Sequence, residues 1–287
     1  MSDVYDHHLP ARVGVYGGGR MGAGIAHAFL VSGGSVVIVE STAEAGRAAA
    51  ERVARSLEQA ARRGALPGPA EEAARRLEVA CDPAALAECA LVIEAVPEDP
   101  ALKADVLGRA AAAAPGAVLA TNTSSLSVDG LAGTLARPES FVGLHFFNPV
   151  PASTLVEIVV GARTSRDLVA ACQAWVRALG KTPITVTDSP GFASSRLGVA
   201  LALEAMRMVE DGVASAEDID TAMTLGYRHP MGPLRTTDVV GLDVRLAIAE
   251  HLHRELGPRF TPPAILRDKV ADGHLGRKTG QGFYSWN

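Results

Sequence analysis

The chain has 287 residues, a length that suits two domains, and 48% of them are hydrophobic. This composition supports a sizeable core and excludes a largely disordered protein. The formal net charge is −5, and no basic run alternates with aromatic residues, so nucleic acid is not expected as a partner.

The compartment is predicted from the cysteines and the N-terminus. Three cysteines, Cys81, Cys89 and Cys172, are odd in number and lack metal-ligand spacing, which predicts buried, reduced thiols and no metal site. The first ten residues have acidic side chains and no apolar core, so no signal peptide is expected. No apolar stretch is long enough to span a membrane. We therefore expect a cytoplasmic protein without a membrane partner.

The first predicted strand, residues 12–16, leads into a G-x-G-x-x-G turn and then into an apolar helix. In this pattern the first glycine permits a tight turn, the second lets the backbone approach a pyrophosphate, and the third lets helix and strand pack closely. The phosphates then lie on the free N–H groups at the helix N-terminus. The residues predicted to hold them are Gly17, Gly19, Arg20, Met21 and Gly22.

The second predicted strand, residues 35–39, is followed directly by Glu40, 18 residues after Gly22. A carboxylate at this point is positioned to accept hydrogen bonds from a ribose 2′-OH. Its negative charge repels a 2′-phosphate. The predicted cofactor is therefore NAD rather than NADP.

Strand-like and helix-like segments alternate from residue 12 to about residue 187. Near-continuous Val, Ile and Leu strands between helices are typical of a mostly parallel, doubly wound sheet of the Rossmann type. From residue 189 onward the pattern predicts helices only. We expect an α/β, NAD-binding Rossmann domain over residues 1–188 and an all-helical C-terminal domain over residues 189–287.

Two helices of the second half are predicted in more detail. One is long and amphipathic, and another covers about residues 238–256. The residues that share the apolar face of the first are Leu197, Ala200, Leu201, Ala205 and Met208.

Polar side chains occur where strands of the first half end. Ser124 follows the strand at residues 117–120, and His145 ends the strand at residues 141–144. Glu157 lies inside the strand at residues 155–160, where a carboxylate is costly unless it is paired. Antiparallel neighbours would bring Glu157 to His145, orient the imidazole and raise its basicity. A hydroxyl from Ser124 opposite the imidazole would polarise a carbonyl.

Several strings of this sequence resemble the short-chain L-3-hydroxyacyl-CoA dehydrogenases, which include the 3-hydroxybutyryl-CoA dehydrogenases. The strings are residues 17–22, 121–125, 143–149, 189–192, 218–223, 229–233 and 276–284, so the resemblance spans nearly the whole chain. It implies an NAD-dependent oxidoreductase of fatty acid β-oxidation with an acyl-CoA substrate. It also implies a homodimer, whose helical domain supplies the dimer interface and half of the substrate cleft.

The resemblance implies roles for individual residues. His145 is the general base, Glu157 orients it, and Ser124 binds the reacting oxygen. Positions that match cofactor contacts are Glu94, Asp99, Asn148 and Lys278, and positions that match contacts to the CoA moiety are Ser56 and Arg63.

One position departs from the family. Where the family has Gly-Phe-x-x-Asn-Arg-Leu, this chain has Ser195 in place of the asparagine. A serine hydroxyl can still donate to the substrate oxygen but reaches less far, and losing one such donor costs about 2–4 kcal/mol of transition-state stabilisation. Besides the 3-hydroxyacyl-CoA dehydrogenase, two alternatives stay open: a dehydrogenase of a free 3-hydroxy acid or sugar acid, and an NAD-binding protein with an impaired active site.

Overall fold

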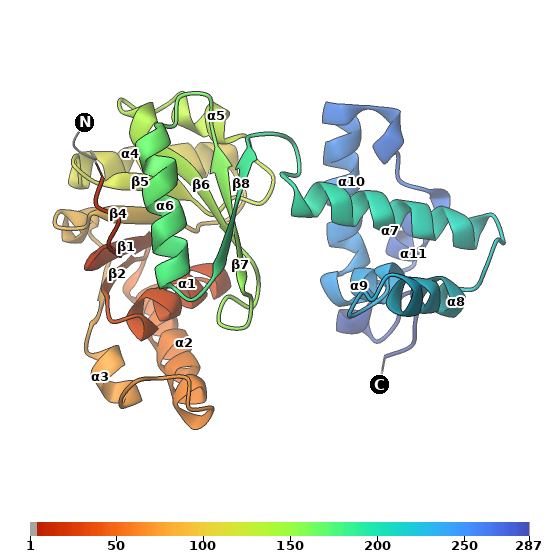
Figure 1. The fold of residues 1–287 in the computed structure, drawn as a ribbon, viewed down its shortest axis with the longest axis horizontal. Helices are drawn as coiled ribbons and strands as arrows, with labels where there is room; N and C mark the ends of the chain where they lie inside the picture. Colours follow the sequence, from red (N-terminus) through yellow and green to blue (C-terminus); the bar gives the residue numbers. More distant parts are fainter. Residues whose placement is uncertain (1–4, 287) are drawn as a thin grey trace. The chain divides into compact units, whose positions relative to one another are not determined.

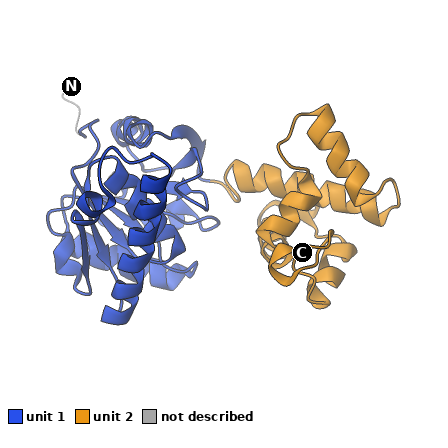
Figure 2. Cartoon of the chain, turned by 90° about the horizontal axis from the view of Figure 1, so that it is seen from below, with its two compact units in different colours: residues 1–188 blue, residues 189–287 orange. Residues whose placement is uncertain are grey.

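The change from mixed to purely helical sequence near residue 188 coincides with a division in the structure. The computed structural model describes residues 5–286 and separates into unit 1, Met1–Asp188, and unit 2, Ser189–Asn287 (Figure 2). Unit 1 has helices on a central sheet, whereas the described residues of unit 2 form helices and two isolated β-bridges. The predicted fold class, a mostly parallel Rossmann-type sheet followed by a helical domain, is confirmed.

The sheet of unit 1 has eight strands among the residues that the structure describes (Figure 1). They are β1 (Arg12–Tyr16), β2 (Ser35–Val39), β3 (Leu77–Ala80), β4 (Leu91–Glu94), β5 (Val118–Thr121), β6 (Phe141–Phe146), β7 (Leu155–Val160) and β8 (Thr182–Thr187). Their order across the sheet is β3-β2-β1-β4-β5-β6-β7-β8. Strands β1 to β6 are mutually parallel, β7 is antiparallel to β6, and β8 is parallel to β7. The order reverses between β1 and β4, where ligands of such sheets bind beyond the carboxyl ends.

Helices cover both faces of this sheet (Figure 1). Alternate strand residues point to opposite faces. On one face, Val15 and Ile158 share a core with α1 (Arg20–Val31), α2 (Ala43–Arg62) and α6 (Arg166–Ala178). On the other face, a Cβ added to Gly143 would lie 3.0 Å from Val128 of α5 (Val128–Ala132). The remaining helices of unit 1 are α3 (Ala70–Ala74) and α4 (Pro100–Ala113).

The helices of unit 2 are α7 (Ser194–Glu210), α8 (Ala216–Thr221), α9 (Pro233–Val240), α10 (Leu242–Leu256) and α11 (Ala264–Ala271). The prediction of one continuous helix over residues 238–256 is wrong. Gly241 has a φ of 108°, which ends α9 and begins α10. Glycine tolerates this backbone conformation because it has no Cβ.

Helix α7 is apolar on two sides, and the predicted face is only partly the buried one: Ala205 is buried and Met208 packs against the core, but Leu197 does not. The buried residues of α7 are Val199, Ala202, Leu203, Ala205 and Met206. Leu197, from the expected face, is 71% exposed within this chain. The periodicity therefore predicted the helix but only part of its buried face.

A buried carboxylate joins three segments of unit 2. Asp220 accepts hydrogen bonds from the backbone N–H groups of Leu234 at 2.9 Å and Arg235 at 2.8 Å, at the start of α9. It also accepts one from the Tyr284 hydroxyl at 2.8 Å. Burial, together with this bond to Asp220, raises the pKa of Tyr284. A Cβ on Gly232 would overlap the Asp220 side chain, which explains the glycine in the Pro-Met-Gly-Pro string.

A second buried carboxylate, Asp238, holds the C-terminal tail. It accepts hydrogen bonds from the N–H groups of Phe283 at 2.8 Å and Tyr284 at 2.9 Å, and from the Trp286 indole at 2.8 Å. A Cβ on Gly282 would overlap this carboxylate. The strings of unit 2 that resemble the family therefore include residues that hold the backbone together.

Three further sequence predictions can be compared with the described residues. Cys89 and Cys172 are buried free thiols, but Cys81 is exposed, so the prediction of burial is wrong for that residue, which directly follows β3. Within residues 5–286, no helix has the length and apolarity needed to cross a membrane. The same residues contain no cluster of three or more His, Cys, Asp or Glu side chains that could hold a metal ion.

Candidate functional site

The glycine-rich turn lies at the carboxyl end of β1, at the point where the strand order reverses. Gly17 has a φ of 92° and donates its N–H to the Val39 carbonyl at 2.9 Å. A Cβ on Gly22 would overlap the Gly17 carbonyl oxygen, whereas a Cβ on Gly19 would meet nothing within 4 Å. The turn is therefore tightly packed at Gly17 and Gly22 and open at Gly19. No side chain caps the N-terminus of α1, so its N–H groups are available to phosphates.

Glu40 lies directly beside this turn. Its Oε1 accepts a hydrogen bond from the Gly18 N–H at 2.6 Å, and its Oε2 accepts one from the Ser41 N–H at 3.2 Å. On the other side, the Arg52 guanidinium donates to the Gly18 carbonyl at 3.2 Å. An open phosphate cradle with a carboxylate beside it fits the adenosine half of NAD.

His145 and Glu157 meet across the antiparallel pair of β6 and β7. The strand register places them opposite one another, and His145 Nδ1 lies 2.8 Å from Glu157 Oε2. Glu157 is 0% exposed and His145 is 7% exposed. A carboxylate bound to Nδ1 fixes the tautomer in which Nε2 presents its lone pair. The antiparallel pairing predicted from the sequence is confirmed.

The loop that carries Ser124 follows β5, the neighbour of β6. Thr121 of β5 pairs with Gly143 of β6, so Ser124 and His145 both lie beyond the paired residues at the same edge of the sheet. The Asn122 amide oxygen accepts the Phe146 N–H at 2.9 Å, which ties the two strand ends together.

Sequence reasoning missed Glu98, which organises this loop. Its Oε1 accepts hydrogen bonds from the Thr123 hydroxyl at 2.6 Å and from the N–H groups of Ser124 at 2.9 Å and Ser125 at 3.0 Å. Burial alone would raise the pKa of Glu98, but the Thr123 hydrogen bond and the charge of Lys103 outweigh it and lower the pKa. The signal in the sequence was its position, in the turn after β4 at the switch point.

Glu94 and Asp99, which the resemblance assigned to the cofactor, already make close contacts within the fold. The Glu94 carboxylate is 1% exposed and binds Lys103 Nζ and the Thr121 hydroxyl, each at 2.7 Å. Lys103, equally buried, also lies 3.3 Å from Glu98 and so balances both acids. Asp99 accepts the Leu102 N–H at 2.7 Å and caps the N-terminus of α4.

A cavity of about 580 Å³ lies between α1, α2 and the segment at residues 148–152. It brings together four residues that the sequence analysis singled out, Arg20, Ser56, Arg63 and Asn148, and it is also lined by Arg52 and Arg55. Arg55 lies 3.5 Å from Glu51, but the other three arginines make no ion pair among the described residues. The cavity therefore carries excess positive charge, which suits phosphate groups.

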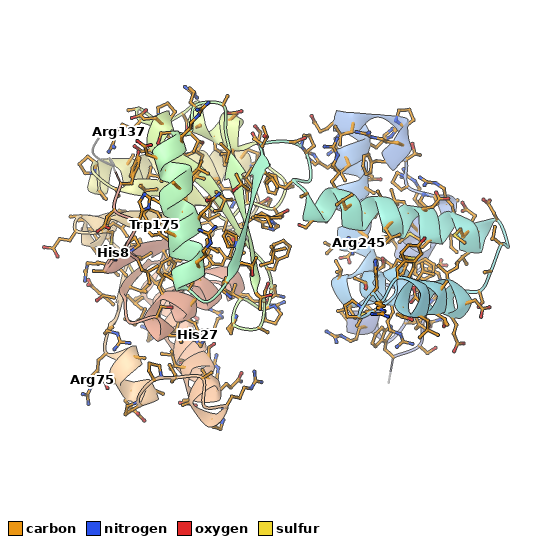
Figure 3. The ribbon with its side chains drawn as sticks, viewed as in Figure 1. His8, His27, Arg75, Arg137, Trp175 and Arg245 are labelled. Atoms are coloured by element: carbon orange, nitrogen blue, oxygen red, sulfur yellow. The ribbon has the colours of Figure 1, made fainter. Side chains whose placement is uncertain are left out.

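His27 of α1 lines the same cavity (Figure 3). It is 5% exposed, and its Nδ1 has no hydrogen-bond partner within residues 5–286. Burial, assisted by the charge of Lys181, lowers its pKa to about 4. The imidazole is therefore neutral at pH 7 and adds no charge to the cavity.

Two predicted site residues belong to unit 2. Ser195 lies in the first turn of α7. Lys278 lies in a short 3₁₀ segment, Arg277–Thr279, where its Nζ contacts both carboxylate oxygens of Asp243 at 2.6 Å.

The matches to known protein families divide the chain at the same place as the two structural units. The family model for the NAD-binding domain of 3-hydroxyacyl-CoA dehydrogenase matches residues 12–189, and the model for the C-terminal domain of that enzyme matches residues 191–286. The chain belongs to the 3-hydroxyacyl-CoA dehydrogenase family. It is accordingly an NAD-dependent oxidoreductase.

Individual relatives agree with this family over nearly the full chain. A probable 3-hydroxybutyryl-CoA dehydrogenase of Deinococcus radiodurans is 40% identical over 279 residues, which cover 96% of this chain and 100% of the relative. A 3-hydroxybutyryl-CoA dehydrogenase of Mycobacterium tuberculosis is 39% identical over 280 residues and covers 96% of this chain and 98% of the relative. The crystal structure of (S)-3-hydroxybutyryl-CoA dehydrogenase from Ralstonia eutropha has a TM-score of 0.92 and 39% identity, covering 97% and 99% of the two chains.

Proposed function

We propose that the enzyme oxidises an L-3-hydroxyacyl-CoA of the 3-hydroxybutyryl-CoA type to the 3-oxoacyl-CoA, with His145 as general base. The observation that carries this proposal is the buried pairing of His145 with Glu157 at 2.8 Å, on the sheet edge that also bears Ser124. The family match supports the reaction class, and the geometry supports the roles of the residues.

In this proposal the proton of the 3-hydroxyl group passes to Nε2 of His145. The glycine-rich turn would hold NAD, which would supply the acceptor for the hydride from C3. The positive charge that develops on the imidazole is stabilised by the buried carboxylate of Glu157. Ser124 donates its hydroxyl hydrogen to the reacting oxygen, and Glu98 holds the Ser124 loop through the Ser124 N–H. In the reverse direction, His145 returns the proton to that oxygen.

Ser195 is proposed as a second donor to the substrate oxygen, contributed by α7. The shorter serine side chain replaces the asparagine of the family, so the proposal assigns it a weaker contact. A single hydroxyl donates one hydrogen bond, as the amide of asparagine would at this point.

The arginine-lined cavity supports a CoA thioester over a free hydroxy acid. CoA carries a diphosphate and a 3′-phosphate, and Arg20, Arg52 and Arg63 line the cavity without an ion pair among the described residues. Arg20 and Arg52 lie beside the glycine-rich turn and would also face NAD, so the cation that a free 3-hydroxy acid would leave without a counter-charge is Arg63. We propose that Ser56 and Arg63 bind CoA phosphate groups.

NADH absorbance with 3-hydroxybutyryl-CoA and with free 3-hydroxybutyrate tests the proposal. The thioester should have a kcat/KM at least about 100-fold higher, because binding energy from the remote CoA moiety contributes to catalysis. Arg63→Ala should raise KM for the thioester. The control is Arg62→Ala, because Arg62 is exposed and lies 3.9 Å from Glu58 rather than in the cavity. Equal efficiency with the free acid would contradict the CoA assignment, and NAD binding without turnover of either substrate would indicate an impaired site.

We also propose that unit 2 forms the interface of a homodimer. Of the exposed large hydrophobic residues in the described part of the chain, all but Leu102 belong to unit 2. They include Leu225, 78% exposed, and Tyr227, 75% exposed. A contiguous patch of exposed apolar side chains marks an interaction surface, and we propose that these residues form one. Light scattering coupled to size-exclusion chromatography should give twice the chain mass, and a monomer would contradict the proposal.

A further inference from the structure

Unit 2 contains a cavity of about 290 Å³ that the proposed chemistry does not use. Its walls come from α7, α9 and α10 and from the segment before α9. They are mainly apolar, with Leu197, Leu201, Met231 and Pro233 among the lining residues. One charged side chain, Arg245 of α10, also lines the cavity (Figure 3).

Arg245 is half-buried, and one atom of its guanidinium lacks a partner. Its Nε is buried without a hydrogen-bond partner, and the guanidinium makes no ion pair among the described residues. The two nearest acids on α10 are already paired, Asp243 with Lys278 at 2.6 Å and Glu250 with Arg267 at 2.9 Å. Burial correspondingly lowers the pKa of Arg245. A buried N–H group without a hydrogen-bond partner is costly to the fold.

The local sequence leaves room for this side chain. A Cβ added to Gly198 would lie 3.5 Å from Arg245 Nη1. The guanidinium therefore lies beside Gly198, a position of α7 that has no side chain. The buried charges of unit 2, Asp220 and Asp238, are each satisfied by three donors. The Nε of Arg245 has no such partner among the described residues, and the cavity beside it is large enough to admit an anion.

The cavity also lies next to a residue of the proposed reaction site. Ser195, which we propose to contact the substrate oxygen, precedes Gly198 by three residues on α7. That separation is about 4.5 Å along a helix axis. An acyl chain that leaves the reacting carbon toward Gly198 therefore reaches the Arg245 cavity within a few methylene groups.

We propose that this cavity binds the far end of the acyl chain and that Arg245 pairs there with a carboxylate. The substrates would then include 3-hydroxyacyl-CoA thioesters of dicarboxylic acids. The apolar walls suit methylene groups, and the planar guanidinium binds a carboxylate through two parallel hydrogen bonds. This inference rests on the proposed function, since it extends the acyl-CoA substrate of that proposal.

Two thioesters of equal chain length test it, 3-hydroxyadipyl-CoA with a terminal carboxylate and 3-hydroxyhexanoyl-CoA with a terminal methyl group. The ratio of their kcat/KM values should favour the dicarboxylic substrate in the unaltered enzyme. In Arg245→Leu that ratio should fall about 30-fold or more, because the carboxylate loses its charged partner. Arg245→Lys should keep an intermediate ratio, since the charge remains and the paired geometry is lost. An equal change on both substrates, or no change in the ratio, would overturn the inference.

Arg254→Leu is the matched control. Arg254 is an exposed arginine of the same helix and does not line the cavity. Its replacement removes the same charge and should leave the substrate ratio as it is. If Arg245→Leu fails to fold, Arg245→Lys still tests the inference. An unaltered ratio of the two kcat/KM values in that variant, together with equal binding of adipyl-CoA and hexanoyl-CoA, would overturn it.

Calorimetry with the non-reactive thioesters adipyl-CoA and hexanoyl-CoA separates the two proposals. If adipyl-CoA binds more tightly than hexanoyl-CoA and this preference is lost in Arg245→Leu, the cavity assignment is supported. This holds even if the enzyme oxidises neither hydroxy substrate, because absent turnover would contradict only the proposed function. Oxidation of both substrates without discrimination by Arg245 would contradict only the inference. A change of oligomeric mass in Arg245→Leu would assign the guanidinium to a partner subunit and overturn the inference as well.

Discussion

The two units use acidic side chains in different ways. In unit 1, Glu157 binds the imidazole of His145, and Glu98 binds the loop that carries Ser124. In unit 2, Asp220 and Asp238 accept mainly backbone N–H groups and connect helices to the tail. The difference indicates that the sequence strings shared with the family have different physical reasons in the two units. Those of unit 1 follow from chemistry at a strand edge, and those of unit 2 follow from chain connection.

This comparison leads to opposite expectations for substitutions. Replacing His145 by a side chain that can still hydrogen-bond the buried Glu157 should reduce turnover with a small effect on the free energy of unfolding. Removing a carboxylate that holds the tail should reduce the free energy of unfolding, because several buried donors lose their acceptor.

The largest effect is expected for His145→Gln. Without a general base, kcat should fall about 1,000-fold, since such groups contribute about 10²–10⁴-fold. NAD binding and the melting temperature should stay close to those of the unaltered enzyme. Initial rates of NADH formation and titration with NAD measure both quantities. Turnover within about tenfold of the unaltered enzyme would mean that His145 is not the base.

The next effect is expected for Asp238→Ala. Three donors, including the Trp286 indole, would lose their partner, and the free energy of unfolding should fall by about 3 kcal/mol. Urea denaturation measures this value. Asp272→Ala, at an exposed residue that follows α11, is the control. A variant with full stability but lost turnover would contradict the structural role of Asp238.

His27 sharpens the comparison, because it is a buried polar residue of unit 1 with an unpaired Nδ1. Its pKa is lowered from 6.5 to about 4 in the folded protein. The unfolded chain therefore binds the proton more readily, so stability is fully present above pH 6.5 and is lost as the pH falls toward 4. At about pH 5 the loss is about 2 kcal/mol.

Urea denaturation at about pH 7.5 and pH 5 tests this linkage, with His27→Gln as the comparison. The variant lacks the titrating imidazole, so the difference in unfolding free energy between the two proteins should depend on pH by about the same 2 kcal/mol. A difference that does not vary with pH would show that His27 titrates alike in both states.

The smallest effect is expected for Glu40→Ala. Loss of the carboxylate beside Gly18 removes the repulsion of a 2′-phosphate, and the Arg52 guanidinium nearby offers it a positive charge. The ratio of kcat/KM for NAD over NADP should fall about tenfold. Glu44→Ala, at an exposed residue in the first turn of α2, is the control. An unchanged ratio would remove Glu40 from the ribose site.

Much of unit 1 could be predicted because its constraints are local. The spacing of Gly17, Gly19 and Gly22 defines a turn that few other structures need, and alternating apolar runs define the strands. The pairing of Glu157 with His145 followed from the cost of leaving a carboxylate alone in an apolar strand. For the glycine turn, the strands and the His145–Glu157 pairing, the sequence leaves few structural alternatives.

Other features depend on contacts that periodicity does not encode. Glu98 has no regular position in a strand or helix, so its bonds to the Ser124 loop appear only once β4 and β5 are side by side. Helix α7 is apolar on two sides, and the choice of buried side depends on where α9 and α10 pack. Gly241 interrupts a pattern that is otherwise helical. The unpartnered Nε of Arg245 could not be predicted either, because its lack of a partner is a property of the folded unit.

The role of His145 is tested most directly by a crystal structure of the enzyme with NAD and acetoacetyl-CoA bound together. The account predicts that Nε2 of His145 lies about 2.6–3.2 Å from the 3-oxo oxygen while Nδ1 keeps its contact with Glu157. An imidazole directed away from that oxygen, with another side chain at hydrogen-bond distance, would contradict it.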